Sequence, residues 1–77
     1  MDTTEYLDFV ASIFGVGRGT LSRQTAYSSM PEWDSVMQIR LVMELEAHYG
    51  VEIPMEQAAN LTTLGAFFDY VAARRPA

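Results

Sequence analysis

Residues 33–54 have the sequence WDSVMQIRLVMELEAHYGVEIP, and the fold follows from this stretch. Apolar residues recur in it at the three- and four-residue spacing of one helical face. These residues are Leu41, Val42, Leu45 and Tyr49. Gly50 and Pro54 follow as stop signals, because glycine ends helices and proline cannot continue them. We therefore predict a helix from Ser35 to Tyr49.

Two further helices are predicted on either side of this one. The earlier helix has Asp2 and Glu5 at the spacing of a capping box and Gly15 as a stop signal. Its apolar residues are Tyr6, Leu7, Phe9, Val10, Ile13 and Phe14. In the later helix, Arg74 and Arg75 complement the C-terminal dipole. Its apolar stripe is Leu64, Phe67, Phe68 and Val71, and its candidate N-caps are Asn60, Thr62 and Thr63.

A short helical turn is predicted after Pro54, since proline suits the first position of a helix. Val51 and Ile53 alternate with Glu52, but no partner strand is available to form a sheet with them. The sequence thus predicts an all-α fold, a small bundle of three main helices and one short helix, with a long loop after the first helix.

That loop spans residues 15–34, about twenty residues, whereas connections in helix bundles usually have about 2–8. Leu21 is the one candidate anchor for a hidden helix within it, and a single apolar residue is too little to hold one. We predict an ordered loop that lays Met30, Pro31 and Trp33 against the bundle. Trp33 is expected to pin the loop to the core.

Composition limits what the protein can do. The chain has 77 residues, 49% hydrophobic and 19% charged, which predicts a single small globular domain over residues 1–77. A domain of this size has room for one modest core and little room for a walled catalytic cleft. The absence of cysteine excludes a disulfide scaffold, a cysteine nucleophile and a cysteine-based zinc site.

Charge limits the partners. Ten acidic residues oppose five arginines, which gives a net charge of −5, and there is no lysine. Nucleic acid and anionic membranes are poor partners, because binding them needs clustered basic groups. We expect protein partners with basic patches. No apolar run approaches about 18 residues and the N-terminus lacks a signal-peptide pattern, so we expect a cytoplasmic protein.

Residues for catalysis are scarce. His48 is the only histidine, and a lone helical histidine is usually a solvated surface residue, so we expect no metal site or general base there. The acidic residues of the second half are expected to form a solvated face. They include Glu44, Glu46, Glu52 and Glu56. No phosphate-binding glycine loop or catalytic triad order is present, so we expect that the protein is not an enzyme.

Ser35 has two interpretations. It stands at the start of the strongest helix, and with Gln38 it matches the S-x-x-Q capping box, which makes it a candidate N-cap. It is also a candidate covalent site. A phosphate attached to its hydroxyl would meet unpaired backbone N–H groups and the positive end of the helix dipole. Taken alone, these residues favour the cap.

The stretch from Trp33 to Pro54 resembles the acyl and peptidyl carrier proteins. The shared features are Asp34-Ser35, the Leu-Val-Met-x-Leu-Glu run at residues 41–46, and the Gly-Val-Glu-Ile-Pro exit at residues 50–54. The resemblance continues through Leu61-Thr62-Thr63-Leu64-Gly65 and Phe68-Asp69-Tyr70-Val71, so that it covers about half of the chain. Asp-Ser alone is common, but its combination with this helix, exit and Thr-Thr-x-Gly start is specific.

The resemblance implies that Ser35 receives 4′-phosphopantetheine from coenzyme A through a separate phosphopantetheinyl transferase, which reads Asp34. The thiol of this arm would then carry an acyl or aminoacyl group as a thioester. Docking on partner enzymes would involve Val36, Met37, Arg40, Met43 and Glu46. A cargo pocket between the second and third helices would be lined by Leu41, Leu45, Leu61 and Phe68.

The resemblance also implies the partners. Besides the transferase, we expect a ligase or transferase that loads acyl or aminoacyl groups, and synthase or condensation enzymes. The carrier itself is expected to act as a monomer.

The outer face of the second helix departs from carriers of fatty-acid synthesis, which are acidic there. Val36, Arg40, Met43 and Ala47 make this face nearly apolar with one positive charge. This favours a discrete carrier in a specialised type II polyketide, nonribosomal-peptide or small-acyl-unit pathway. The alternatives are a carrier of primary fatty-acid synthesis and a helical interaction module that has kept the fold without the cofactor.

Overall fold

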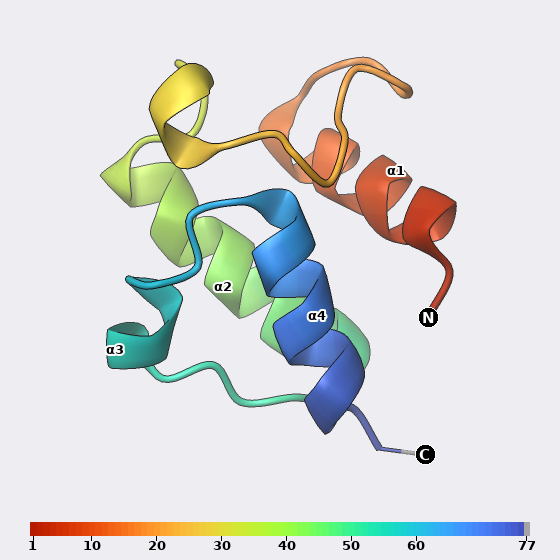
Figure 1. The fold of residues 1–77 in the computed structure, drawn as a ribbon, viewed down its shortest axis with the longest axis vertical. Coiled ribbons are helices and arrows are strands. Elements are labelled where there is room, and N and C mark those ends of the chain that lie inside the picture. Colours follow the sequence, from red (N-terminus) through yellow and green to blue (C-terminus); the bar gives the residue numbers. More distant parts are fainter. Residues whose placement is uncertain (77) are drawn as a thin grey trace.

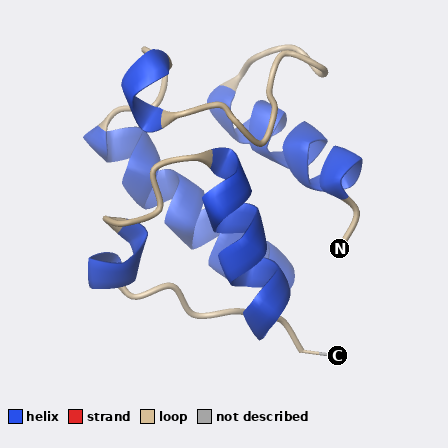
Figure 2. Cartoon of the chain, viewed as in Figure 1, coloured by secondary structure: helices blue, strands red, loops and turns tan. Residues whose placement is uncertain are grey.

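The computed structural model describes residues 1–76, and its regular elements are helices (Figure 1). In chain order they are α1 (Thr3–Phe14), the 3-10 helix η1 (Tyr27–Ser29), α2 (Ser35–Tyr49), α3 (Met55–Ala58) and α4 (Leu64–Arg74). Figure 2 shows these helices joined by loops, and among the described residues the β-type pairing is limited to one isolated bridge. The predicted all-α fold is confirmed. No helix within residues 1–76 combines the length and apolarity needed to cross a membrane.

The predicted helix ends are set by local backbone geometry. Gly15 and Gly50 have φ values of 72° and 68°, in the left-handed region that residues with a Cβ rarely adopt. Each donates its N–H to a carbonyl in the last turn of the helix before it. At the start of α1, an Asp2 side-chain oxygen accepts a hydrogen bond from the Glu5 N–H at 3.0 Å, which is the N-cap half of the predicted capping box.

The core lies between α1, α2 and α4, with α4 crossing in front of α2 in Figure 1. Its fully buried side chains come from all three helices and include Tyr6, Val10, Leu41, Leu45, Leu64, Phe67 and Val71. The Tyr6 hydroxyl donates a hydrogen bond to the Leu64 carbonyl at 2.8 Å, and burial raises the pKa of this phenol well above its ordinary range. This bond ties α1 to the first residue of α4.

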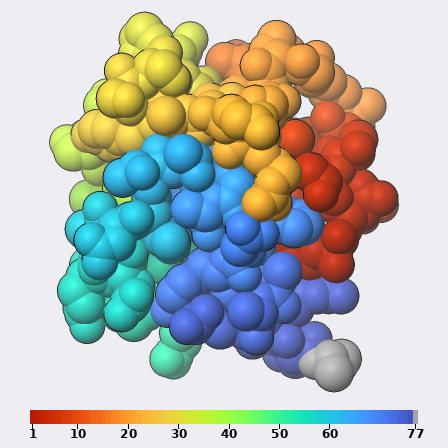
Figure 3. Space-filling model, in the orientation of Figure 1, coloured from red at the N-terminus to blue at the C-terminus, as the bar shows by residue number. Residues whose placement is uncertain are grey.

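The long loop is held to the start of α4 by backbone hydrogen bonds. The N–H groups of Leu64 and Gly65 donate to the carbonyls of Thr25 and Arg23 at 3.0 and 2.9 Å. The first N–H groups of a helix have no partner inside the helix, so the loop supplies what α4 lacks. Figure 3 shows the loop lying against the start of α4. These bonds explain how so long a connection is ordered.

Trp33 anchors the far end of the loop, as predicted. Its side chain is 2% exposed and its ring lies 5.8 Å from Phe14 and 6.0 Å from Phe67, measured between ring centroids. Met30 also packs against the core, but Pro31 is exposed, so the prediction for Pro31 is wrong. The 3-10 helix η1 was not predicted, because it contains no buried residue and therefore no apolar pattern.

Candidate functional site

Ser35 is the first residue of α2, and Asp34 is its N-cap. Asp34 has an extended backbone, with φ −103° and ψ −173°, and its Oδ1 accepts a hydrogen bond from the Met37 N–H at 2.8 Å. The predicted capping box of Ser35 and Gln38 is therefore wrong. The cap must come from the last non-helical residue, and that residue is Asp34.

The Gln38 side chain, which the capping box would have required, is committed elsewhere. Its Oε1 accepts a hydrogen bond from Trp33 Nε1 at 2.7 Å, and its Nε2 donates to the Ala58 carbonyl at 3.0 Å. One amide thus connects the end of the long loop, the first turn of α2 and the short helix α3. No buried side-chain nitrogen or oxygen in residues 1–76 is left without a partner.

The Ser35 side chain does not help to hold the fold together. Its side chain is exposed, and within residues 1–76 its hydroxyl makes no hydrogen bond. The N–H groups of Ser35 and Val36, in the first turn of α2, have no partner in the same part of the chain. A phosphodiester on the Ser35 oxygen would find these donors and the positive end of the α2 dipole beside it, so these residues suit a phosphate-linked group.

An open apolar depression of about 370 Å³ begins at Ser35. Its lining side chains come from η1, the first part of α2, α3 and the segment that follows α3. Its lining residues are Tyr27, Ser35, Gln38, Ile39, Met55, Ala59, Leu61 and Thr62. The depression is large enough to hold a small apolar group next to a chain attached at Ser35.

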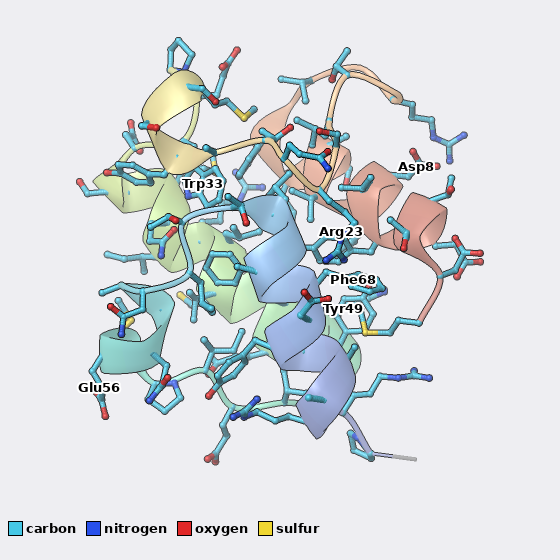
Figure 4. The ribbon with its side chains drawn as sticks, in the orientation of Figure 1. Asp8, Arg23, Trp33, Tyr49, Glu56 and Phe68 are labelled. Carbon is cyan, nitrogen blue, oxygen red and sulfur yellow. The ribbon has the colours of Figure 1, made fainter. Side chains whose placement is uncertain are left out.

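The predicted cargo pocket agrees with this depression only at Leu61. Leu41 and Leu45 are fully buried in the core and do not line it. Phe68 lies on another side of the molecule, with its ring 5.2 Å from Tyr6 and the Arg23 guanidinium 5.3 Å from its centre. Figure 4 shows Arg23 and Phe68 together, away from Trp33. These three residues thus do not line the depression, and their contact with cargo stays a prediction, since a sequence pattern does not separate a core wall from a pocket wall.

The predicted docking residues divide into two groups. Val36 and Met43 are 74% and 62% exposed, and Arg40 is exposed and forms no ion pair within residues 1–76. Met37 is half-buried against the core, and Glu46 accepts a hydrogen bond from the Ile53 N–H at 2.8 Å. These two residues serve the fold. Ile39, which is 50% exposed between Ser35 and Met43, was missed by the sequence reasoning.

His48 is a surface residue, as expected, but it is not isolated. Its ring stacks on Phe9 with centroids 4.0 Å apart and helps to fix α1 against α2. Within residues 1–76 no three side chains of the metal-binding types His, Cys, Asp and Glu gather into a candidate metal site. The arrangement around Ser35 therefore offers one exposed hydroxyl and an apolar depression.

Comparison with known proteins identifies the family to which the chain belongs. The family model for the phosphopantetheine attachment site matches residues 7–71. The chain belongs to the acyl carrier protein family. Its relatives include the acyl carrier protein of Rubrobacter xylanophilus, which is 33% identical over the full length of both chains. The acyl carrier protein of Chlorobium phaeobacteroides is 31% identical over 83% of this chain and 82% of the relative.

A solved structure supports the same fold. The holo acyl carrier protein of Geobacter metallireducens superposes with a TM-score of 0.82 over 96% of this chain and 86% of that protein, at 24% sequence identity. Membership of the acyl carrier protein family makes this chain a carrier rather than an enzyme, with 4′-phosphopantetheine as its prosthetic group.

Proposed function

We propose that Ser35 is the attachment point of the 4′-phosphopantetheine arm. The observation that carries this proposal is that Asp34, and not Ser35, caps α2. The Ser35 hydroxyl can therefore be esterified without loss of a structural hydrogen bond. Modification at this position leaves the cap in place. Asp34 also flanks the reacting hydroxyl, which supports its proposed recognition by the phosphopantetheinyl transferase.

The arm supplies a thiol, on which an acyl or aminoacyl group is carried as a thioester. The chain itself has no cysteine and no lysine, so it contributes neither a thiol nor an amine side chain that could take the cargo from the arm. The depression beside Ser35 is suited to cover a small apolar cargo, with Ile39, Met55 and Leu61 as its apolar wall.

We further propose a docking surface made of Val36, Ile39, Arg40 and Met43. These residues lie on the exposed side of α2, beside the attachment point, and three of them are apolar. The partner suited to them is an enzyme surface with apolar side chains and an acidic group that faces Arg40. Packing contributes more to such an interface than charge does, because charged rim pairs mainly set association rates.

The apolar docking surface favours a carrier of a specialised type II pathway that builds polyketides, nonribosomal peptides or small acyl units. We further propose that the carrier acts in the cytoplasm and as a monomer. A carrier of primary fatty-acid synthesis is the alternative. Loading assays separate the two. A specialised carrier is loaded faster by an acyl- or amino-acid-activating ligase than by the malonyl transferase of fatty-acid synthesis.

The attachment site is tested by mass. The protein is incubated with coenzyme A and a broad-specificity phosphopantetheinyl transferase, and the intact mass is measured. We expect one phosphopantetheinyl group on the wild type and on Ser28→Ala, a control at another exposed serine near the depression, and none on Ser35→Ala. An adduct that persists in Ser35→Ala would place the arm on another residue. A pathway that still makes its product with Ser35→Ala would favour an interaction module without cofactor.

A further inference from the structure

Gln38 occupies a distinctive place on α2. It begins the inward stripe of the helix, which continues at i+3, i+4 and i+7 with the buried Leu41, Val42 and Leu45. Ser35 lies one turn before it. With a rise of about 1.5 Å per residue, Gln38 lies about 4.5 Å and Leu41 about 9 Å from Ser35 along the helix axis. An apolar chain that leaves Ser35 along this stripe therefore meets an amide before it meets the core.

The amide of Gln38 is held in place at both ends. Trp33 Nε1 donates to its oxygen at 2.7 Å, and its nitrogen donates to the Ala58 carbonyl at 3.0 Å. Trp33 and Ala58 are 2% and 1% exposed, so water cannot readily replace Gln38 at either group. The Ala58 carbonyl also accepts the Leu61 N–H at 3.0 Å. Buried polar groups that lose their partners are destabilising, which makes the bond from Trp33 to Gln38 hard to break.

These bonds lie at the boundary between the depression and the core. Gln38 and Ala59 line the depression, whereas Ala58 belongs to the buried cluster with Leu41 and Leu45. The bond from Gln38 to Ala58 therefore joins α2 and α3 at the inner end of the depression. Cargo that follows α2 from Ser35 toward Leu41 would meet this pair first.

We propose that Gln38 is the residue that sets the length of cargo the carrier shelters. Its amide closes the inner end of the depression, so a short acyl group is covered beside Ser35 and a long alkyl chain is kept out of the core. This inference rests on the proposed function, because the cargo hangs from Ser35. The residue acts on cargo selection and has no part in attaching the arm.

The test replaces Gln38 by an apolar residue of similar size. Gln38→Met keeps the volume and removes both hydrogen bonds, so a change in cargo behaviour reports the polar connection and not the space. Because this variant leaves the Trp33 N–H without a partner, a second variant combines Gln38→Met with Trp33→Phe. Gln57→Met is the matched control, since Gln57 is exposed on α3 and its side chain makes no hydrogen bond in residues 1–76.

Butanoyl- and decanoyl-phosphopantetheine arms are attached to Ser35 from the corresponding acyl-coenzyme A by the phosphopantetheinyl transferase, which releases adenosine 3′,5′-bisphosphate. Methyl signals are then followed by NMR. In the wild type and in Gln57→Met, we expect both arms to shift the signals of Ile39 and Leu61 and to leave Leu41 and Leu45 unchanged. In the Gln38 variants, the decanoyl arm shifts Leu41 and Leu45 as well, and raises the melting temperature above that of the butanoyl form. A decanoyl arm that reaches Leu45 in the wild type overturns the proposal, as does a Gln38 variant that behaves like the wild type.

A second measurement needs no arm. Xenon enters apolar cavities, so the apo protein is equilibrated with xenon under pressure and the same methyl signals are followed. We expect shifts at Ile39 and Leu61 in the wild type, extended to Leu41 and Leu45 in Gln38→Met. If the intact mass shows no arm on Ser35, the attachment proposal fails by itself. The xenon shifts still decide whether Gln38 closes the depression, and equal shifts in both proteins overturn that role.

Discussion

Asp34 and Ser35 are adjacent residues of the same capping type, and the backbone gives them different tasks. Asp34 is extended and its carboxylate accepts the Met37 N–H, whereas Ser35 is already helical and exposed. Either side chain could have capped α2. The choice of Asp34 leaves a free hydroxyl at the first position of the helix, next to the apolar depression.

The stability of the protein without the arm tests whether Asp34 or Ser35 caps α2. We expect Asp34→Ala to lower the free energy of unfolding by about 1 kcal/mol, the usual loss for an N-cap, because the Met37 N–H loses its acceptor. Ser35→Ala should change it by less than about 0.5 kcal/mol, as exposed substitutions without a structural bond do. Urea unfolding at pH 7 measures both. A larger loss in Ser35→Ala than in Asp34→Ala would return the cap to Ser35.

At the level of elements, α4 depends on the loop that passes its first turn. The Arg23 carbonyl accepts the Gly65 N–H at 2.9 Å, and a Cβ built on Gly65 would lie 2.9 Å from the same oxygen. The oxygen cannot move away without breaking that hydrogen bond. A glycine at this position therefore allows the backbone of the loop to approach the helix closely.

Gly65→Ala should destabilise the protein by about 1–3 kcal/mol, the range for overpacking a tight contact. Gly17→Ala is the matched control, since its added Cβ would meet Thr20 at an ordinary 3.7 Å. We expect the control to lie within about 0.5 kcal/mol of the wild type. Thermal and urea unfolding compare the two. Equal stability of the two variants would show that the loop moves away from α4 at little cost.

The elements differ in how far the sequence predicts them. The ends of α1 and α2 follow from signals within a few residues, such as Asp2 before Glu5 and Gly50 after Tyr49, so they were predictable. The cap of α2 was not predictable, because the Gln38 side chain forms hydrogen bonds with Trp33 and Ala58, and Ala58 lies in another element. Similarly, the depression forms where Tyr27, Ile39 and Met55 meet, and no local pattern brings residues of three elements together.

For the molecule as a whole, the exposed apolar residues are unevenly placed. The five large hydrophobic side chains that are exposed among residues 1–76 all belong to η1, α2 and α3. They are Tyr27, Val36, Ile39, Met43 and Met55. Tyr27 and Met55 line the depression together with Ile39. Val36 and Met43 lie on either side of Ile39 along α2. α1 and α4 contribute none, so the molecule presents one apolar side, and Ser35 lies on it.

This placement predicts how the carrier meets its partners, and in particular how its docking depends on salt. Association driven by charge weakens steeply as ionic strength rises, because salt screens exposed charges. Docking on Val36, Ile39 and Met43 should depend on salt only weakly. We therefore expect the loading rate by the partner enzyme to fall by less than about threefold between 0.05 and 0.5 M NaCl, well below the change that electrostatic steering produces.

A matched pair of variants tests the same surface. Met43→Glu puts a charge into the docking surface, and Ala72→Glu adds the same charge on an exposed position of α4. Because burying an unpaired carboxylate at an apolar contact is strongly unfavourable, Met43→Glu should slow loading at least about tenfold, and Ala72→Glu should leave it unchanged. Intact mass and circular dichroism confirm that both variants are folded and carry the arm. Equal slowing by both variants would mean that net charge governs docking; no slowing by either would move the partner contact away from α2.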